Sequence, residues 1–130
     1  FTVDPADIDE DALTTSDPTE TAEDLALAKA QAVAKRHPDA LVIGSDTVVA
    51  LETEEGWVQY AKPADEDDAF RILTTLSGKT HWVITGVAVV GPRGSHVSSD
   101  STGVTFKVLD PDSIREYILT GNPMDKAGAY

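Results

Sequence analysis

The sequence of 130 residues contains no cysteine, few basic residues and no long apolar run. Without cysteine the chain forms no disulfide and performs no thiolate chemistry. A membrane-spanning helix needs roughly 18 or more consecutive apolar residues, and no stretch of the sequence approaches that length. We therefore expect a cytoplasmic protein that has no membrane partner.

The shortage of basic residues leaves a strongly acidic chain, with 23 aspartate and glutamate residues against 10 lysine and arginine residues and a net charge of −13. Such a surface repels nucleic acid, so we expect no nucleic-acid partner. An anionic substrate must find a local basic pocket in this acidic field. Each lysine or arginine beside a motif is therefore informative.

Apolar periodicity and turn residues predict an alternation of strands and helices. The expected strands cover residues 1–3, 41–51, 57–60, 80–90 and 96–109, and the expected helices cover residues 19–36, 65–76 and 111–120. The acidic stretch up to residue 18 and the segment 122–130 are predicted to be loops. This order favours an α/β fold in which a mixed sheet is flanked by helices.

The three predicted helices each have an apolar face and recognisable ends. Their expected core positions are Ala22, Leu25, Ala26, Ala28, Ala32 and Val33 in the first, Ala69, Ile72, Leu73 and Leu76 in the second, and Ile114, Tyr117, Ile118 and Leu119 in the third. Thr19 or Thr21 is expected to cap the first helix, and Asp110 the third. A hydrophobic fraction of 41% suits one domain over residues 1–130. Because the chain opens on Phe-Thr-Val without methionine, we expect it to be truncated at both ends.

Asp46 is the residue that most clearly points to function. It lies in the apolar strand 41–51, where a bare charge would be very costly to bury. The carboxylate must therefore be hydrogen-bonded, ion-paired, metal-bound or exposed in a cleft. A structural carboxylate that caps neighbouring backbone is the alternative interpretation.

Lysines on helices and loops supply the opposite charge. Lys29 falls on the predicted apolar face of the first helix, Lys62 precedes Pro63 in a loop, and Lys126 follows Asp125 near the end of the chain. Lysines bind phosphate oxygens as point charges, and carboxylates bind Mg²⁺ or Mn²⁺ and activate water. These residues favour a hydrolase of phosphate esters or anhydrides, whereas an exposed turn with a weak ion pair is the alternative for the loop around Lys126.

Other common chemistries have little support. No glycine-rich phosphate loop of a common kind is present, and no two histidines have the spacing of a zinc site. His37 is interpreted as a helix cap, and His81 and His96 are interpreted as structural residues. Gly86 interrupts an apolar strand, which indicates a bulge or a close backbone approach.

Six short motifs occur in a distinctive order along the chain. They are Gly44-Ser45-Asp46-Thr47-Val48-Val49, Lys62-Pro63, Leu76-Ser77-Gly78-Lys79-Thr80-His81, Thr85-Gly86-Val87, Val104-Thr105-Phe106 and Asp125-Lys126-Ala127-Gly128-Ala129-Tyr130. In this order they resemble the Maf family of nucleotide pyrophosphatases over essentially the whole chain.

The resemblance implies an enzyme that hydrolyses the α–β phosphoanhydride of a nucleoside triphosphate to the monophosphate and pyrophosphate. It implies a divalent metal cofactor, Mg²⁺ or Mn²⁺, and an inosine-triphosphatase-like (Maf/Ham1) fold with two lobes. The third and last motifs are similar to those of the branch that acts on dTTP and UTP, and modified nucleotides are further expected substrates. A homodimer is also an expectation of the resemblance.

The resemblance also implies roles for individual residues. Asp46 matches the family's proton acceptor, and together with Glu10 it is expected to hold the metal. Thr47 matches a position linked to selection of the base. The remaining expected substrate-binding residues are Lys29, Lys62 and Lys126.

Two segments of the family pattern are absent from this sequence, a Ser-x-Ser-Pro-Arg-Arg loop and a Gly-Ile-Gln-Gly segment. We therefore expect an excerpt of a longer protein that has little activity on its own. A non-catalytic nucleotide-binding or regulatory module linked to septum formation remains the alternative. A third hypothesis is an unrelated acidic α/β phosphatase in which Asp46 is a nucleophile.

Overall fold

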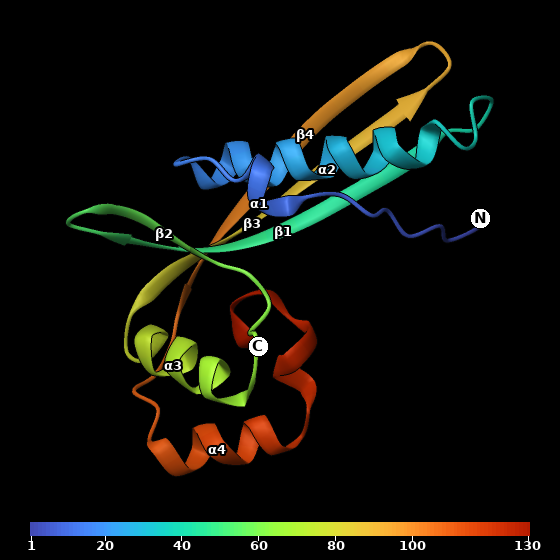
Figure 1. Cartoon of the computed structure of the whole chain (residues 1–130). Coiled ribbons are helices and arrows are strands. Elements are labelled where there is room, and N and C mark those ends of the chain that lie inside the picture. Colours follow the sequence, from blue (N-terminus) through green and yellow to red (C-terminus); the bar gives the residue numbers. More distant parts are fainter. The chain divides into compact units, whose positions relative to one another are not determined.

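A computed structural model describes all 130 residues of the chain (Figure 1). The helices are α1 (Glu10–Leu13), α2 (Pro18–Ala34), α3 (Glu66–Leu76) and α4 (Pro111–Leu119), and the strands are β1 (Val42–Thr53), β2 (Gly56–Tyr60), β3 (Thr80–Gly91) and β4 (Gly94–Thr105). Two short 3₁₀ turns, Asn122–Asp125 and Ala127–Ala129, follow α4. None of the helices has the length and apolar character needed to cross a membrane.

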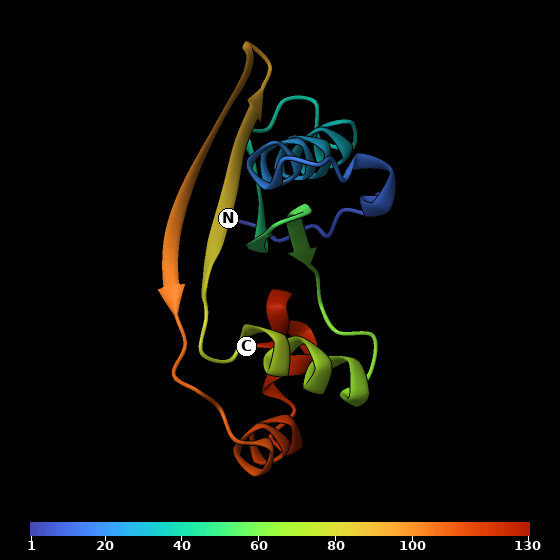
Figure 2. The ribbon, with the colours of Figure 1, turned by 90° about the vertical axis from the view of Figure 1, so that its left-hand side faces the viewer.

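The four strands form one sheet in the order β2-β1-β3-β4. Strands β1 and β2 pair as an antiparallel hairpin from Val49 opposite Tyr60 to Thr53 opposite Gly56. A tight turn joins β3 to β4, and Figure 2 shows these two strands running side by side in opposite directions. The predicted α/β class is confirmed. The sheet is antiparallel, whereas the sequence predicted a mixed one.

The chain divides into two compact units, each built from two separate segments. Unit 1 contains residues 1–47 and 84–101, and unit 2 contains residues 48–83 and 102–130. Strands β1, β3 and β4 therefore each contribute residues to both units. Because each unit has its own core, the two are described separately.

In unit 1, helix α2 packs against the sheet through small residues. Ala26, Ala30, Val42 and Ala88 form the buried cluster. A Cβ atom added to Gly44 would lie 2.5 Å from the carbonyl oxygen of Ala26, and one added to Gly86 would collide with the backbone of α2. The close backbone approach predicted at Gly86 is therefore confirmed.

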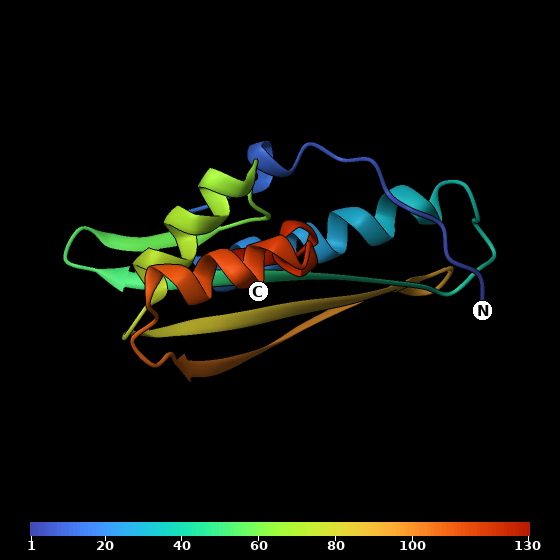
Figure 3. The same ribbon diagram turned by 90° about the horizontal axis from the view of Figure 1, so that it is seen from below.

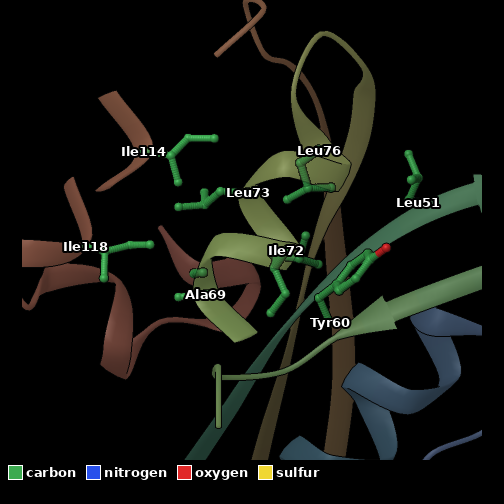
Figure 4. Close-up of a cluster of buried hydrophobic side chains, with 10 residues drawn as sticks. Leu51, Tyr60, Ala69, Ile72, Leu73, Leu76, Ile114 and Ile118 are labelled. Carbon is green, nitrogen blue, oxygen red and sulfur yellow. The ribbon is translucent and has the colours of Figure 1, made fainter. Parts of the chain in front are cut away.

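In unit 2, helices α3 and α4 lie side by side and share one core (Figure 3). The predicted apolar face of α3 is fully buried, together with two positions of α4 and residues of β1 and β2 (Figure 4). These core residues are Val49, Leu51, Tyr60, Ala69, Ile72, Leu73, Leu76, Ile114, Ile118 and Ala129. The predicted cap of α4 is also present, because the Asp110 carboxylate accepts the Ser113 backbone N–H. Gly121, just after the helix, adopts a left-handed conformation.

Several predictions at the edges of the elements are wrong. Residues 1–3 form no strand, and the acidic stretch predicted as loop contains helix α1. Asp17, rather than a threonine, caps α2 by accepting the Thr19 backbone N–H. Leu119 is 79% exposed and lies outside the core. In α2 the buried stripe includes Ala30, whereas the expected core positions Ala28 and Ala32 are half-buried.

The structure gives physical reasons for two of these differences. The N-terminal segment is held to the end of α2 by charge, since Arg36 donates two hydrogen bonds to the Asp4 carboxylate and His37 contacts the same carboxylate at 2.9 Å. Helix α1 has only four residues and no buried side chain. An element that short leaves no apolar periodicity in the sequence.

Candidate functional site

Asp46 occupies the face of β1 against which α2 packs. Side chains alternate along a strand, so Asp46 shares its face with Val42 and Gly44, the residues that contact α2. Its side chain is only 13% exposed. The Lys29 ammonium group donates a hydrogen bond to Asp46 Oδ1 over 2.6 Å. The partner that the sequence required for this carboxylate is therefore Lys29.

Lys29 connects two carboxylates in unit 1. Its Nζ atom lies 2.6 Å from Asp46 Oδ1 and 3.2 Å from Glu10 Oε1. Partial burial of the ammonium group lowers the pKa of Lys29, but the hydrogen bonds and charges of Asp46 and Glu10 outweigh this, and the net pKa is raised above its ordinary value. Lys29 is therefore a permanent cation at neutral pH, with its charge 2.6 Å from the Asp46 carboxylate.

Glu10, the first residue of α1, extends its side chain to this cluster. The Asp9 carboxylate caps this helix by accepting the Ala12 backbone N–H. The Glu10 side chain remains 55% exposed. The structure thus brings together three residues that the sequence assigned to one site, Glu10, Lys29 and Asp46, although they lie up to 36 positions apart in the chain.

Glu10 and Asp46 carry carboxylate oxygens, which are the donors that a hard divalent cation such as Mg²⁺ prefers. The structure contains no group of three or more histidine, cysteine, aspartate or glutamate side chains that could hold a metal by themselves. Mg²⁺ is commonly bound through one or two carboxylates together with substrate phosphates and water. The carboxylates of Glu10 and Asp46 lie on the same ammonium group, that of Lys29.

Thr47 lies on the opposite face of β1 from Asp46, since successive side chains of a strand point to opposite sides. The Thr47 and Thr85 hydroxyls are 3.0 Å apart and are hydrogen-bonded. Thr47 therefore belongs to a different surface of unit 1 from the Lys29 cluster. Its expected role in base selection stays a prediction.

The other two predicted substrate-binding residues, Lys62 and Lys126, lie in unit 2. Lys62 Nζ is 2.8 Å from Asp125 Oδ1, and both side chains are exposed. The hydrogen bond and charge of Lys62, followed by the charge of Lys126, lower the pKa of Asp125. The structure therefore places a small exposed group of two cations and one carboxylate in this unit.

His81, the last residue of the third motif, is fully buried in unit 2. Its Nε2 atom is 2.5 Å from the Tyr130 hydroxyl, and the rings of His81, Phe106 and Tyr130 meet edge to face. Burial lowers the pKa of His81. The sequence interpretation of His81 as a structural residue therefore agrees with its position in the core.

Sequence reasoning missed two features of these sites. It did not find that Lys62 pairs with Asp125, 63 positions away. It also did not find that Thr21 is buried and hydrogen-bonded to Thr15. For the Thr21–Thr15 bond, the only signal in the sequence is the polar run before Pro18, and such a run indicates no more than the start of a helix.

A family model described as Maf-like protein matches residues 1–130 of the chain. The chain belongs to the Maf family. It contains all six motifs in the expected order, and the motif residue Asp46 is the one that Lys29 contacts.

Several curated proteins are similar to most or all of this chain. One named dTTP/UTP pyrophosphatase, from Moorella thermoacetica, is 51% identical over 132 residues that span 100% of this chain and 66% of the relative. Another of that name, from Koribacter versatilis, is 45% identical over 130 residues, which are 100% of this chain and 65% of the relative. A third, from Thermococcus kodakarensis, is 47% identical over 116 residues, which are 88% of this chain and 60% of the relative. The chain thus spans just under two thirds of the length of these relatives.

Proposed function

We propose that this chain is part of a nucleoside triphosphate pyrophosphatase that hydrolyses the α–β phosphoanhydride. The observation that carries the proposal is the contact of Lys29 with both Asp46 and Glu10, at 2.6 and 3.2 Å. It places a sheltered carboxylate, a permanent cation and a second carboxylate at one point. Membership in the Maf family and the names of the relatives support this reaction.

In the proposed reaction Asp46 is the general base. Its ionised carboxylate takes one proton from a water molecule whose oxygen forms a bond to the α-phosphorus. The bond from that phosphorus to the bridging oxygen breaks, and its electron pair leaves with pyrophosphate. The products are the nucleoside monophosphate and pyrophosphate.

Lys29 has two roles in this scheme. Before substrate binds, it holds the Asp46 side chain in place through the 2.6 Å hydrogen bond. When a triphosphate binds, the same ammonium group offsets the negative charge that develops on phosphate oxygens. A partly buried cation performs this better than an exposed one, because water screens it less.

Glu10 and Asp46 are the residues that would hold a divalent cation. When bound, Mg²⁺ or Mn²⁺ polarises phosphate oxygens and lowers the pKa of water. The exposure of Glu10 leaves room for ligands from water and substrate.

We propose dTTP and UTP as substrates, as the relatives are named. Lys62 and Lys126 are proposed to bind phosphate oxygens, because they are exposed cations in a strongly acidic chain. Thr47 is proposed to take part in selection of the base. A cytoplasmic location and a homodimer stay predictions from the sequence.

The test is pyrophosphate release from dTTP and UTP by the full-length protein with Mg²⁺ or Mn²⁺. We expect Asp46→Asn to lower kcat by roughly 100-fold or more, the usual contribution of a general base. Asp39→Asn is the matched control, since Asp39 is an exposed aspartate of the same unit. The control variant should keep the wild-type rate.

The products separate this reaction from the alternatives. Monophosphate plus pyrophosphate supports the proposal. Release of inorganic phosphate, with a phosphorylated Asp46, would indicate a phosphatase instead. Nucleotide binding without hydrolysis in the full-length protein would indicate a regulatory module.

A further inference from the structure

Thr21 is buried although it is polar. Only 2% of its surface is exposed, and His81 is the only other polar or charged residue with comparable burial. The Thr21 hydroxyl accepts a hydrogen bond from the Thr15 backbone N–H over 3.0 Å. It also lies 3.1 Å from the Asp17 carbonyl oxygen. A hydroxyl group has one donor and two acceptor positions, so Thr21 can satisfy both neighbours at once.

This hydroxyl is one end of a hydrogen-bonded connection that leads to α1. The Thr15 hydroxyl donates to the Asp17 carbonyl oxygen and accepts the Asp17 backbone N–H, at 3.0 and 3.2 Å. The neighbouring Thr14 hydroxyl donates to the Glu10 carbonyl oxygen over 3.0 Å. The path from Thr21 to Glu10 therefore runs through two consecutive threonines.

Helix α1 has few other means of staying in place. It contains four residues, none of them buried, and helices this short are not stable by themselves. The Glu10–Lys29 ion pair holds it only weakly, because Glu10 is 55% exposed and exposed ion pairs contribute little. The bonds of Arg36 to Asp4 hold the segment that precedes α1, whereas the connection at Thr21 holds the segment that follows it.

We propose that Thr21 is a positioning residue for Glu10, because its buried hydroxyl locks the connection between α1 and α2 and holds the Glu10 carboxylate beside Lys29. The importance of this for catalysis rests on the proposed function, whereas the structural coupling does not. Loss of the hydroxyl frees α1 and leaves the Lys29–Asp46 hydrogen bond intact. Thr21 touches neither substrate nor metal in this scheme.

The variant that tests the proposal is Thr21→Val, which keeps the shape of the side chain and removes the hydroxyl. Thr21→Ser restores the hydroxyl and should restore the wild-type behaviour. Thr75→Val is the matched control, because the Thr75 hydroxyl bonds a helix carbonyl, that of Arg71, in the other unit. All variants are made in the full-length protein.

Two measurements need no activity. Amide hydrogen exchange should become faster at residues 10–16 in Thr21→Val, while exchange in β1 around Asp46 stays unchanged. The dissociation constant for Mn²⁺, measured without nucleotide, should rise by about tenfold, the usual effect of losing a residue that orients a ligand. Unchanged exchange at residues 10–16 would overturn the proposal.

A double-mutant cycle on kcat/KM separates positioning from general stability. If Thr21 acts through Glu10, Thr21→Val lowers kcat/KM by about tenfold in the wild-type background and has little further effect in a Glu10→Gln background. Equal losses in both backgrounds would overturn the proposal. Absence of pyrophosphate release from wild type would instead refute the proposed function, and hydrogen exchange would still decide the role of Thr21.

Discussion

Gly44 lies directly beneath Ala26 of helix α2, so closely that a Cβ atom on the glycine would be 2.5 Å from the alanine's carbonyl oxygen. This contact fixes the distance between α2 and β1. It therefore also fixes the distance between Lys29 and Asp46, which lie three and two positions further along the same helix and strand.

Gly44→Ala is expected to push α2 away from the sheet. Overpacking of this kind costs about 1–3 kcal/mol of folding stability. The proposed pyrophosphatase activity of the full-length protein should fall with it, because Lys29 loses its hydrogen bond to Asp46. Thermal denaturation and initial rates measure the two effects. Gly91→Ala is the control, since its added Cβ would meet only the flexible end of Leu41. Equal melting temperatures of the two variants would contradict this account.

Removal of the Lys29 charge is expected to leave the partly buried Asp46 carboxylate without the ammonium group that lies 2.6 Å from it. Lys29→Met should lower the free energy of unfolding by about 1–3 kcal/mol. Adding Asp46→Asn should recover part of this loss, because the negative charge that Lys29 offset is then gone. Denaturant titrations of the single and double variants give the coupling, and Lys35→Met, at the exposed end of α2, serves as the control. Strictly additive losses would show that the two side chains do not interact.

His81 should make stability depend on pH in mildly acidic solution. Its ordinary pKa is 6.5 and burial lowers it in the folded protein, so the unfolded chain binds the proton more readily. The stabilisation is complete above pH 6.5 and is lost as the pH falls through the lowered pKa, by at most about 1.4 kcal/mol per pH unit.

Denaturation midpoints between pH 7.5 and 5 measure this effect above the range in which carboxylates titrate. His81→Phe should be less stable overall but should lose the slope in this window. His96→Gln, a change at an exposed histidine, should keep it. A slope that persists in His81→Phe would assign the titration to another group.

Asp125 should compete with substrate for Lys62. The two groups form an exposed ion pair of 2.8 Å, so Asp125→Asn should leave the melting temperature unchanged and should lower KM for the nucleotide by freeing the ammonium group. Lys62→Met should raise KM by about tenfold, the effect of one charge-assisted hydrogen bond. A raised KM in Asp125→Asn would instead give the carboxylate a direct part in substrate binding.

The sequence predicted the longer elements because their signals are local. Helix α3 has its apolar face and its acidic first turn within 11 residues, and Asp110 with Pro111 marks the start of α4. Helix α1 was missed and residues 1–3 were wrongly predicted as a strand. Both depend on contacts with distant segments, such as the pairing of Asp4 with Arg36 just after α2. Strand direction was missed for a similar reason, since periodicity says nothing about which strands become neighbours.

Part of the site was predictable because burying the charge of Asp46 in an apolar strand would be costly. The sequence left a hydrogen bond, an ion pair, a metal or an exposed cleft open for Asp46, and it placed Lys29 on an apolar helix face. The structure pairs the two side chains. The resemblance to the Maf family added Glu10, which no local pattern identifies. The pairing of Lys62 with Asp125 and the burial of Thr21 arise only when distant segments meet.

The interleaving of the two units has a consequence for biosynthesis. Unit 1 needs residues 84–101 as well as residues 1–47, and unit 2 needs residues 102–130 as well as residues 48–83. During synthesis on the ribosome, α2 and the first half of β1 emerge before β3 and β4. The part of the sheet in unit 1 can therefore form only after β3 and β4 have been made. Neither unit can be released as a fragment by a single cut in the chain, because each is built from two separate segments.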